Sequence, residues 1–223
     1  MFRLYGEVMQ LYLIRHAQSL NNSLPEALRV EDPGLTELGH QQARYLAEWI
    51  PSLRLTRLIT SPFLRTLETT ERIHESTSLT PEVRIELHEQ GGCYSGHTPE
   101  NIIGRPGMSR AEIKRRFPGF DVAADIDGQG WWRGMPYESQ EQARQRAARL
   151  LAQTTQEFGD TEERVAYVMH ADIKVLFLAH FHSEPLAAGP HNASVTTIEV
   201  TNTTAQVTDY DRIQHLPPAM VTL

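Results

Sequence analysis

The chain has 223 residues, 40% of them apolar and 22% charged, a composition typical of a globular protein with enough apolar side chains for a core. Its 28 acidic residues outnumber its 21 basic ones, and this net charge of −7 argues against a protein that binds nucleic acid or anionic membranes. The single cysteine, Cys93, excludes an internal disulfide framework and leaves too few thiolates for a cysteine-based zinc site.

No targeting or membrane-spanning segment is predicted from the sequence. No apolar run approaches the roughly 18 residues that a spanning helix needs. Glu7 and Gln10 interrupt the apolar N-terminal stretch, and no small-residue cleavage site follows it. Together with the single thiol, these observations predict a cytoplasmic location. The first strand can begin at Met9 as well as at Met1, so residues 1 to 8 are expected to be dispensable.

Predicted strands and helices alternate over the first 90 residues. Thr36 is a suitable cap for a helix whose apolar residues recur every three or four positions until Pro51 stops it. Ser61 followed by Pro62 is typical of a second helix start. Strands are predicted at Val8 to Ile14, Arg57 to Thr60 and Val83 to Leu87.

Residues 91 to 137 interrupt this alternation. The segment holds nine of the 14 glycines of the chain. It contains one predicted helix, Ser109 to Phe117, where Ser109 and Glu112 have the spacing of a capping box. The segment is therefore expected to be an irregular insertion on a regular scaffold, capping the active site.

Regular elements resume after residue 137. A helix is predicted from about Glu138 to Phe158, with Gly159 at its end. The remaining expected elements are a strand at Val165 to Met169, a helix near Asp172 to Phe181, and closing strands at Ser194 to Thr201 and Ala205 to Tyr210. This alternation predicts an α/β fold, with a mostly parallel central sheet flanked by helices, in a single domain over residues 1 to 223.

The residues with the most chemistry follow the predicted strands. His16 and His170 each come directly after an apolar strand, where α/β sheets bind their ligands. Arg15 adjoins the first histidine, and Arg65 lies in the first turn of a helix, a position that favours anions. Glu89 follows the third predicted strand. The sequence therefore predicts one cationic crevice on an acidic protein.

These stretches resemble a known family. LYLIRHAQSLNN is similar to the opening signature of the histidine phosphatase superfamily, in its phosphoglycerate-mutase-like branch. Further stretches resemble the segments of that family in the same order, from Leu11 to about Leu216 and most weakly over 97 to 135. They are LTELGHQQA, ITSPFLRTLETT, LHEQGGCYSG, VAYVMHADI, HNASVTTIEV and IQHLP.

The resemblance implies a role for each matched residue. His16 is implied to be the nucleophile that accepts the phosphoryl group. Glu89 is implied to protonate the leaving oxygen and then deprotonate the attacking water. Arg15, Arg65 and His170 are implied to hold the phosphate oxygens, and Asn22 to line the pocket.

General chemistry supports these roles without a metal or other cofactor. A phosphomonoester dianion repels nucleophiles, so catalysis depends mainly on charge neutralisation and positioning. Two guanidinium groups and a protonated histidine are expected to replace a metal ion, because guanidinium binds phosphate bidentately. A neutral imidazole is a competent nucleophile near pH 7. We expect a small phosphorylated substrate, and neither nucleic acid nor a membrane as partner.

Three functions fit the sequence. A metal-independent phosphatase of small phosphomonoesters is favoured, because the tryptophan usual after the first histidine in family mutases and their Arg-Arg-Pro stretch are not matched. A phosphoglycerate mutase is the alternative. A catalytically silent phospho-ligand binding protein is the third, since Ala17 and Ala171 replace glycines usual in the family and are expected to narrow the site.

The insertion leaves two alternatives open. Trp131 and Trp132 either pack to anchor it or line the substrate pocket. Its basic residues either form the solvated face of a short helix or a lid that contacts a second anionic group of the substrate. They are Arg105, Arg110, Lys114, Arg115 and Arg116.

Overall fold

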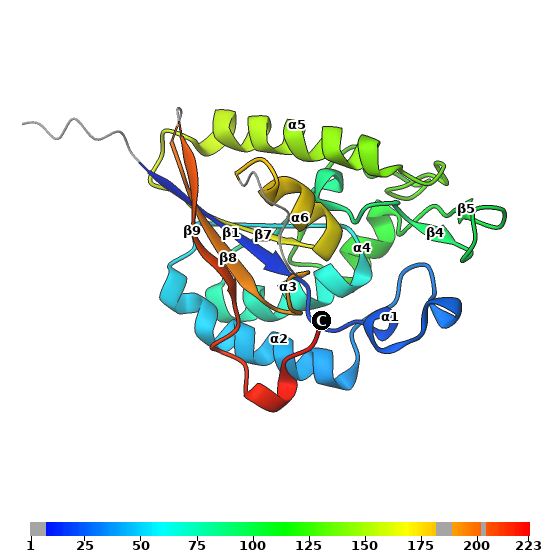
Figure 1. Cartoon of the computed structure of the whole chain (residues 1–223), viewed down its shortest axis with the longest axis horizontal. Coiled ribbons are helices and arrows are strands. Elements are labelled where there is room, and N and C mark those ends of the chain that lie inside the picture. The colour runs from blue at the N-terminus through cyan, green and yellow to red at the C-terminus, as the bar shows by residue number, and fades with distance from the viewer. Residues whose placement is uncertain (1–7, 182–188, 202–203) are drawn as a thin grey trace, which may run out of the picture.

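The computed structural model describes residues 8–181, 189–201 and 204–223. Within these residues, a seven-stranded sheet in the order β6-β3-β2-β7-β1-β8-β9 lies between two layers of helices (Figure 1). Neighbouring strands from β6 to β1 are parallel, whereas β8 and β9 are antiparallel. The strands are β1 (Met9–Arg15), β2 (Arg57–Thr60), β3 (Glu82–Val83), β6 (Asp121–Val122), β7 (Arg164–Met169), β8 (Val195–Val200) and β9 (Ala205–Arg212). The predicted α/β fold with a mostly parallel sheet is confirmed.

The central strands are buried on both faces, and alternate residues point to opposite helix layers. Leu11 and Leu13 of β1 pack in one cluster with α5 (Gln140–Phe158) and α6 (Ala171–Leu178). Tyr12 and Ile14 pack on the other face with α2 (Glu37–Trp49) and α3 (Leu64–Thr77). The helices above and below the sheet in Figure 1 therefore close one apolar cluster on each face.

Several predicted helix boundaries are confirmed by their capping contacts. Thr36 Oγ1 accepts a hydrogen bond from the backbone N–H of Gly39 at the start of α2. The predicted capping box at Ser109 opens α4 (Arg110–Arg116). A second box at Ser139 opens α5, which is the helix predicted from about Glu138. Local side-chain chemistry thus determines where these helices begin.

Three other boundaries were predicted wrongly. Ser61 does not cap a helix, because α3 begins three residues later with Phe63 as its N-cap. The strand predicted over Val83 to Leu87 is limited to the two residues of β3, and Ile85–Leu87 form a 3-10 turn that buries Leu87. Helix α6 begins at Ala171 and ends at Leu178, short of the predicted Phe181.

The insertion is more ordered than its glycine content suggests. It contains a small hairpin of β4 (Tyr94–Ser95) and β5 (Ile103–Gly104), followed by α4. Strand β6 then joins the central sheet beside β3. The predicted helix of the insertion is confirmed, whereas the hairpin and the strand that extends the central sheet were not predicted.

Among the described residues, no helix has both the length and the apolar character needed to cross a bilayer. Residues 1–7 lie outside the described part of the chain, so the dispensability of residues 1 to 8 stays a prediction.

Candidate active site

The register of two parallel strands brings the two histidines together. Arg15 at the end of β1 pairs with Met169 at the end of β7, so His16 and His170 leave the same edge of the sheet side by side. Their ring centroids are 5.2 Å apart with an interplanar angle of 63°. The predicted proximity of these histidines is confirmed, and it follows from the rule that parallel strands present their carboxyl ends on one side.

The His16 ring is held in one tautomer by the backbone. Its Nδ1 lies 2.7 Å from the carbonyl oxygen of Ala17. Because a carbonyl can only accept, Nδ1 carries the proton and Nε2 keeps its lone pair. Burial, followed by the charges of Arg65 and Arg15, lowers the pKa of His16 well below its usual value. His16 is therefore a neutral imidazole with an unprotonated Nε2, as a nucleophile requires.

Two guanidinium groups flank this imidazole. Arg65, in the first turn of α3, directs Nε to within 3.3 Å of His16 Nε2. Arg15 is 6% exposed and donates from Nη1 to the carbonyl oxygen of Pro190, while its buried Nε has no hydrogen-bond partner among the described residues. A buried guanidinium N–H without a partner is available to an anion.

Asp32 is a site residue that the sequence did not reveal. Its Oδ1 accepts a hydrogen bond of 2.9 Å from the backbone N–H of Leu64 and lies 3.9 Å from Arg65 Nη1. Burial raises the pKa of this carboxyl to about 7, although Arg65 opposes the shift. Asp32 thus connects the loop after α1 (Leu20–Ser23) to the start of α3 and orients Arg65.

His170 is fully buried behind His16. Its Nε2 lies 2.7 Å from Ser61 Oγ, and its Nδ1 has no partner within the described residues. Burial, followed by Arg65 and His16, lowers the pKa of His170 well below its usual value. Burial and the neighbouring positive charges therefore disfavour the expected protonated form of His170, and the two guanidinium groups of Arg15 and Arg65 line the cavity.

Glu89 lies at the N-terminus of α6. Its carboxylate accepts hydrogen bonds from the backbone N–H groups of Gln90 at 2.9 Å, Ile173 at 3.1 Å and Asp172 at 3.4 Å. Burial and then the like charge of Asp172 raise the pKa of Glu89 to about 7, against the opposing effect of Arg65. A carboxyl group with this pKa can hold a proton near neutral pH and release it, as a general acid must.

A buried ion-pair network supports the segment that precedes Glu89. Arg146 of α5 binds Glu138 with two hydrogen bonds of 2.8 and 2.6 Å. The same guanidinium donates to the carbonyl oxygens of Glu86 at 2.7 Å and His88 at 3.0 Å. This network was not foreseen, because nothing in the sequence pairs a mid-helix arginine with a turn 58 residues earlier.

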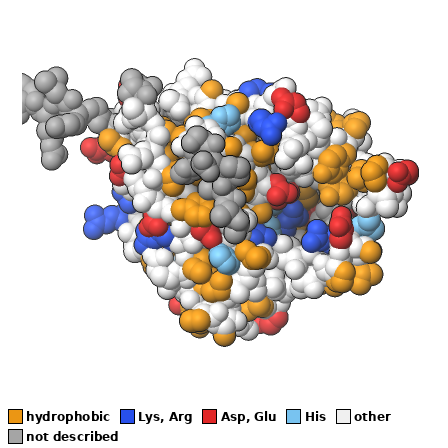
Figure 2. Space-filling model, in the orientation of Figure 1, with side chains coloured by type: hydrophobic (Ala, Val, Ile, Leu, Met, Phe, Trp, Pro, Cys, Tyr) orange, Lys and Arg blue, Asp and Glu red, His pale blue; other side chains and the backbone are white. Residues whose placement is uncertain are grey.

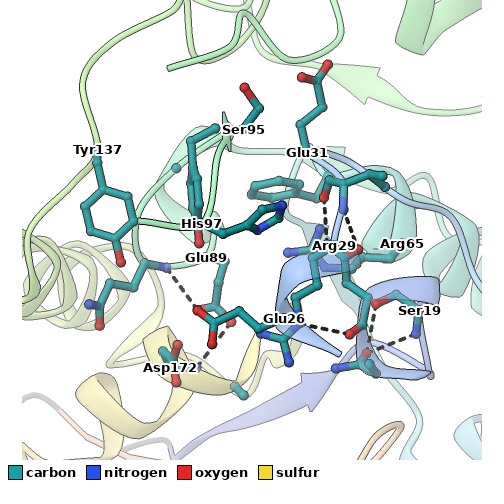
Figure 3. Close-up of a pocket in the computed structure, with 18 of the residues that line it drawn as sticks. Ser19, Glu26, Arg29, Glu31, Arg65, Glu89, Ser95, His97, Tyr137 and Asp172 are labelled. Carbon is teal, nitrogen blue, oxygen red and sulfur yellow. Dashed lines mark hydrogen bonds between the residues drawn. The ribbon is translucent and has the colours of Figure 1, made fainter. Parts of the chain in front are cut away.

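The two histidines, the two arginines and Glu89 are grouped at a cavity of about 410 Å³ at the carboxyl edge of the parallel strands. Arg15, His16, Arg65 and Glu89 line it, and His170 lies behind the wall. Asn22 lines it too, while its Oδ1 accepts from both the backbone N–H and the Oγ of Ser19. Figure 3 shows Glu26, Arg29, Arg65 and Glu89 close together around this space, and Figure 2 shows basic, acidic and histidine side chains around a hollow.

Residues from the insertion contribute to one wall of the cavity. Tyr94, Ser95 and His97 belong to it and line the cavity. Trp131 and Trp132 do not: both are buried in an apolar cluster with Phe63 that supports the insertion, so the packing alternative is correct. The basic residues of positions 105 to 116 are also not part of the cavity wall, and Arg105 and Arg116 form ion pairs with Glu31 and Glu68.

The two alanines that replace family glycines are accommodated without strain. Neither Ala17 nor Ala171 has a positive φ. The Ala17 methyl group packs in the apolar cluster, and its N–H donates to Thr69 Oγ1 at 3.1 Å. Ala171 lines the cavity. Of the two, Ala171 is the one placed where its methyl group can narrow the cavity, and the narrowing itself stays a prediction.

No group of three or more histidine, cysteine, aspartate or glutamate side chains is arranged to hold a metal ion in the described part of the chain.

Comparison with known proteins gives the family. Residues 11–212 match the model of the histidine phosphatase superfamily (branch 1). A curated relative from Photorhabdus laumondii, named "Probable phosphoglycerate mutase GpmB", is 38% identical over 85 residues. That match covers 36% of this chain and 39% of the relative, so it spans about two-fifths of the relative's length.

Solved structures share the fold over nearly the whole chain. A mycobacterial glucosyl-3-phosphoglycerate phosphatase in complex with VO3 has a TM-score of 0.61 and 22% identity, covering 92% of this chain and 99% of that one. A phosphoglycerate mutase from Bacillus anthracis has a TM-score of 0.66 and 18% identity, covering 94% and 96%. Both likenesses concern the fold alone.

Proposed function

We propose that this chain, which belongs to the histidine phosphatase superfamily, is a phosphatase that hydrolyses small phosphomonoesters through a phosphohistidine intermediate at His16. The observation that carries the proposal is the fixed tautomer of His16, whose unprotonated Nε2 accepts a hydrogen bond from Arg65 Nε and lies on the same cavity as Glu89. Nucleophile, anion-binding group and proton donor are then present together.

In the first step, His16 Nε2 attacks phosphorus and the bond to the ester oxygen breaks. The guanidinium groups of Arg15 and Arg65 neutralise the charge on the non-bridging oxygens, and the buried Nδ1 of His170 is a further candidate donor. Glu89 gives its proton to the departing alkoxide, which leaves as an alcohol.

In the second step, water hydrolyses the phosphohistidine. The Glu89 carboxylate removes a proton from the attacking water, and the oxygen bonds to phosphorus as the P–N bond breaks. Inorganic phosphate leaves, His16 is neutral again, and Glu89 has regained its proton. A pKa of about 7 suits both directions of this transfer.

The test is turnover in EDTA by the wild-type protein and by His16→Ala, with His40→Ala on α2 as the matched control. We expect hydrolysis of p-nitrophenyl phosphate by the wild type and the control, and loss of turnover in His16→Ala with unchanged thermal unfolding. Alkaline quench and intact-mass measurement should detect phosphate on the wild type and on His40→Ala, and none on His16→Ala. A His16→Ala protein with near-wild-type rates refutes the proposal, and loss of all activity in EDTA refutes metal independence.

A phosphoglycerate mutase is the second candidate, favoured by the similarity to the Photorhabdus laumondii relative. Conversion of 3-phosphoglycerate in the presence of bisphosphoglycerate, faster than phosphate release, identifies a mutase. Phosphate binding without either activity identifies a silent phospho-ligand binding protein.

A further inference from the structure

The cavity has two zones of opposite charge. Its floor carries the guanidinium groups of Arg15 and Arg65 next to His16. The rest of the lining, called the mouth here, carries three carboxylates, one of which (Asp172) lies beside Glu89, and one guanidinium, that of Arg29; all four are labelled in Figure 3. The carboxylates are Glu26, Glu31 and Asp172.

We infer that the alcohol released by this enzyme is an uncharged polyol or sugar, and that the mouth of the cavity discriminates against substrates with a second anionic group. The inference rests on the proposed phosphatase function and specifies its substrate class. It concerns the part of the substrate beyond the phosphate, which the residues of the floor do not contact.

The cations near the mouth are already engaged. Arg29 Nε donates to the carbonyl oxygen of Asn21 at 3.2 Å. Arg105 pairs with Glu31 at 3.1 Å and donates to Ser95 Oγ at 2.8 Å, and it is not part of the cavity wall. Even with Arg29 and Arg105 both counted against Glu26, Glu31 and Asp172, the mouth keeps an excess of negative charge, which repels a carboxylate or second phosphate there. Such repulsion excludes a substrate with a second negative charge even where no contact favours an uncharged substrate.

The neutral groups of the mouth suit hydroxyl-bearing carbon chains. Tyr94 and Tyr137 form an edge-to-face pair with ring centroids 4.9 Å apart. Gly91, with φ of +94°, lets these rings approach the backbone, since a Cβ there would lie 2.5 Å from Tyr137. Gln90 adds an amide, and carboxylates accept hydrogen bonds from hydroxyl groups. Aromatic faces with polar acceptors are the features that bind a polyol.

Two substrates with the same three-carbon skeleton provide the test. Glycerol 3-phosphate ends in a hydroxymethyl group where 3-phosphoglycerate ends in a carboxylate. We expect kcat/KM for glycerol 3-phosphate to be higher by about tenfold or more at low salt, as for a unit charge meeting like charges near a surface. The ratio should shrink as salt is added, because exposed charges are screened.

The variant Glu26→Gln/Glu31→Gln removes two carboxylates and frees Arg105. Because the Glu31 side chain is 48% exposed, we expect each charge to contribute only about threefold, so that the preference for glycerol 3-phosphate falls by about tenfold. Glu162→Gln is the control, since it removes one charge before β7, at the opposite end of the sheet. This control should keep the wild-type ratio.

Equal kcat/KM for the two substrates, or a ratio unchanged in the double variant, overturns the inference while His16-dependent hydrolysis of p-nitrophenyl phosphate still supports the phosphatase. Absence of that hydrolysis overturns the proposed function itself. A preference for phosphoethanolamine over glycerol 3-phosphate also overturns the inference, because it identifies a cationic alcohol instead.

Discussion

Replacing Glu89 by glutamine tests the proton transfer directly, because the amide has no acidic proton and has nearly the same shape as the carboxyl group. The backbone N–H groups of Gln90 and Ile173 both donate to Oε1, which the glutamine amide can reproduce. Only the weak contact of 3.4 Å from the Asp172 N–H to Oε2 is lost. We therefore expect the thermal unfolding of Glu89→Gln to match that of the wild type.

The expected effect on rate depends on the leaving group. An alkyl phosphate releases an alkoxide that needs a proton, so kcat/KM should fall by about 10²- to 10⁴-fold, the usual contribution of general acid catalysis. Nitrophenolate is a stable anion and leaves without a proton. The loss on p-nitrophenyl phosphate should accordingly be far smaller.

The pH profile provides a second reading of the same variant. Since the pKa of Glu89 is about 7, its acid form is lost as the pH rises through 7, and kcat/KM for an alkyl phosphate should fall by about tenfold per pH unit above that value. This alkaline limb should disappear in Glu89→Gln. Glu86→Gln, which removes a nearby carboxylate that does not line the cavity, is the control. Equal losses on both substrates would show that Glu89 is not the acid.

Three further changes test the surroundings of the site. Arg146→Met leaves the Glu138 carboxylate without its guanidinium partner and should lower the free energy of unfolding in urea by about 3–5 kcal/mol at neutral pH. Because the native pKa of Glu138 is about 2, this loss should shrink as the pH falls from 4.5 through 2 and the carboxyl is protonated. Asp172→Asn removes the like charge beside Glu89, lowers its pKa below about 7 and should shift the alkaline limb of kcat/KM to lower pH. Lys174 is fully buried and its pKa is about 7, so between pH 7 and 10.5 only the unfolded chain binds the proton, and the free energy of unfolding of the wild type should rise with pH. Lys174→Met should be more stable than the wild type at neutral pH, and its free energy of unfolding in urea should lack this rise with pH.

The elements that place the candidate catalytic groups could be predicted because their signals are local. An apolar run followed by Arg15 and His16, and another followed by His170, identify the ends of two parallel strands. The rule for parallel sheets then puts both histidines in one crevice, although the sequence separates them widely.

The groups that support the site could not be predicted, because each depends on a contact between distant segments. Asp32 reaches Arg65 across a loop, and Arg146 reaches the carbonyl of His88 from another helix. Ser61 was misassigned for the same reason: next to Pro62 it resembles a helix cap, but its hydroxyl contacts His170 Nε2 instead. Local propensity was overridden there by a tertiary hydrogen bond.

The pairing of β1 has a consequence for the newly made chain. β1 pairs only with β7 and β8 within the described residues, and both are encoded beyond residue 163. The carbonyl oxygen of His16 also accepts from the backbone N–H of Ala193. A nascent chain that ends before residue 164 therefore carries His16, the proposed nucleophile, at the end of a strand that has neither of its two neighbours. Activity should therefore emerge late in synthesis and abruptly, and translation products that stop before β8 should be inert toward phosphate esters.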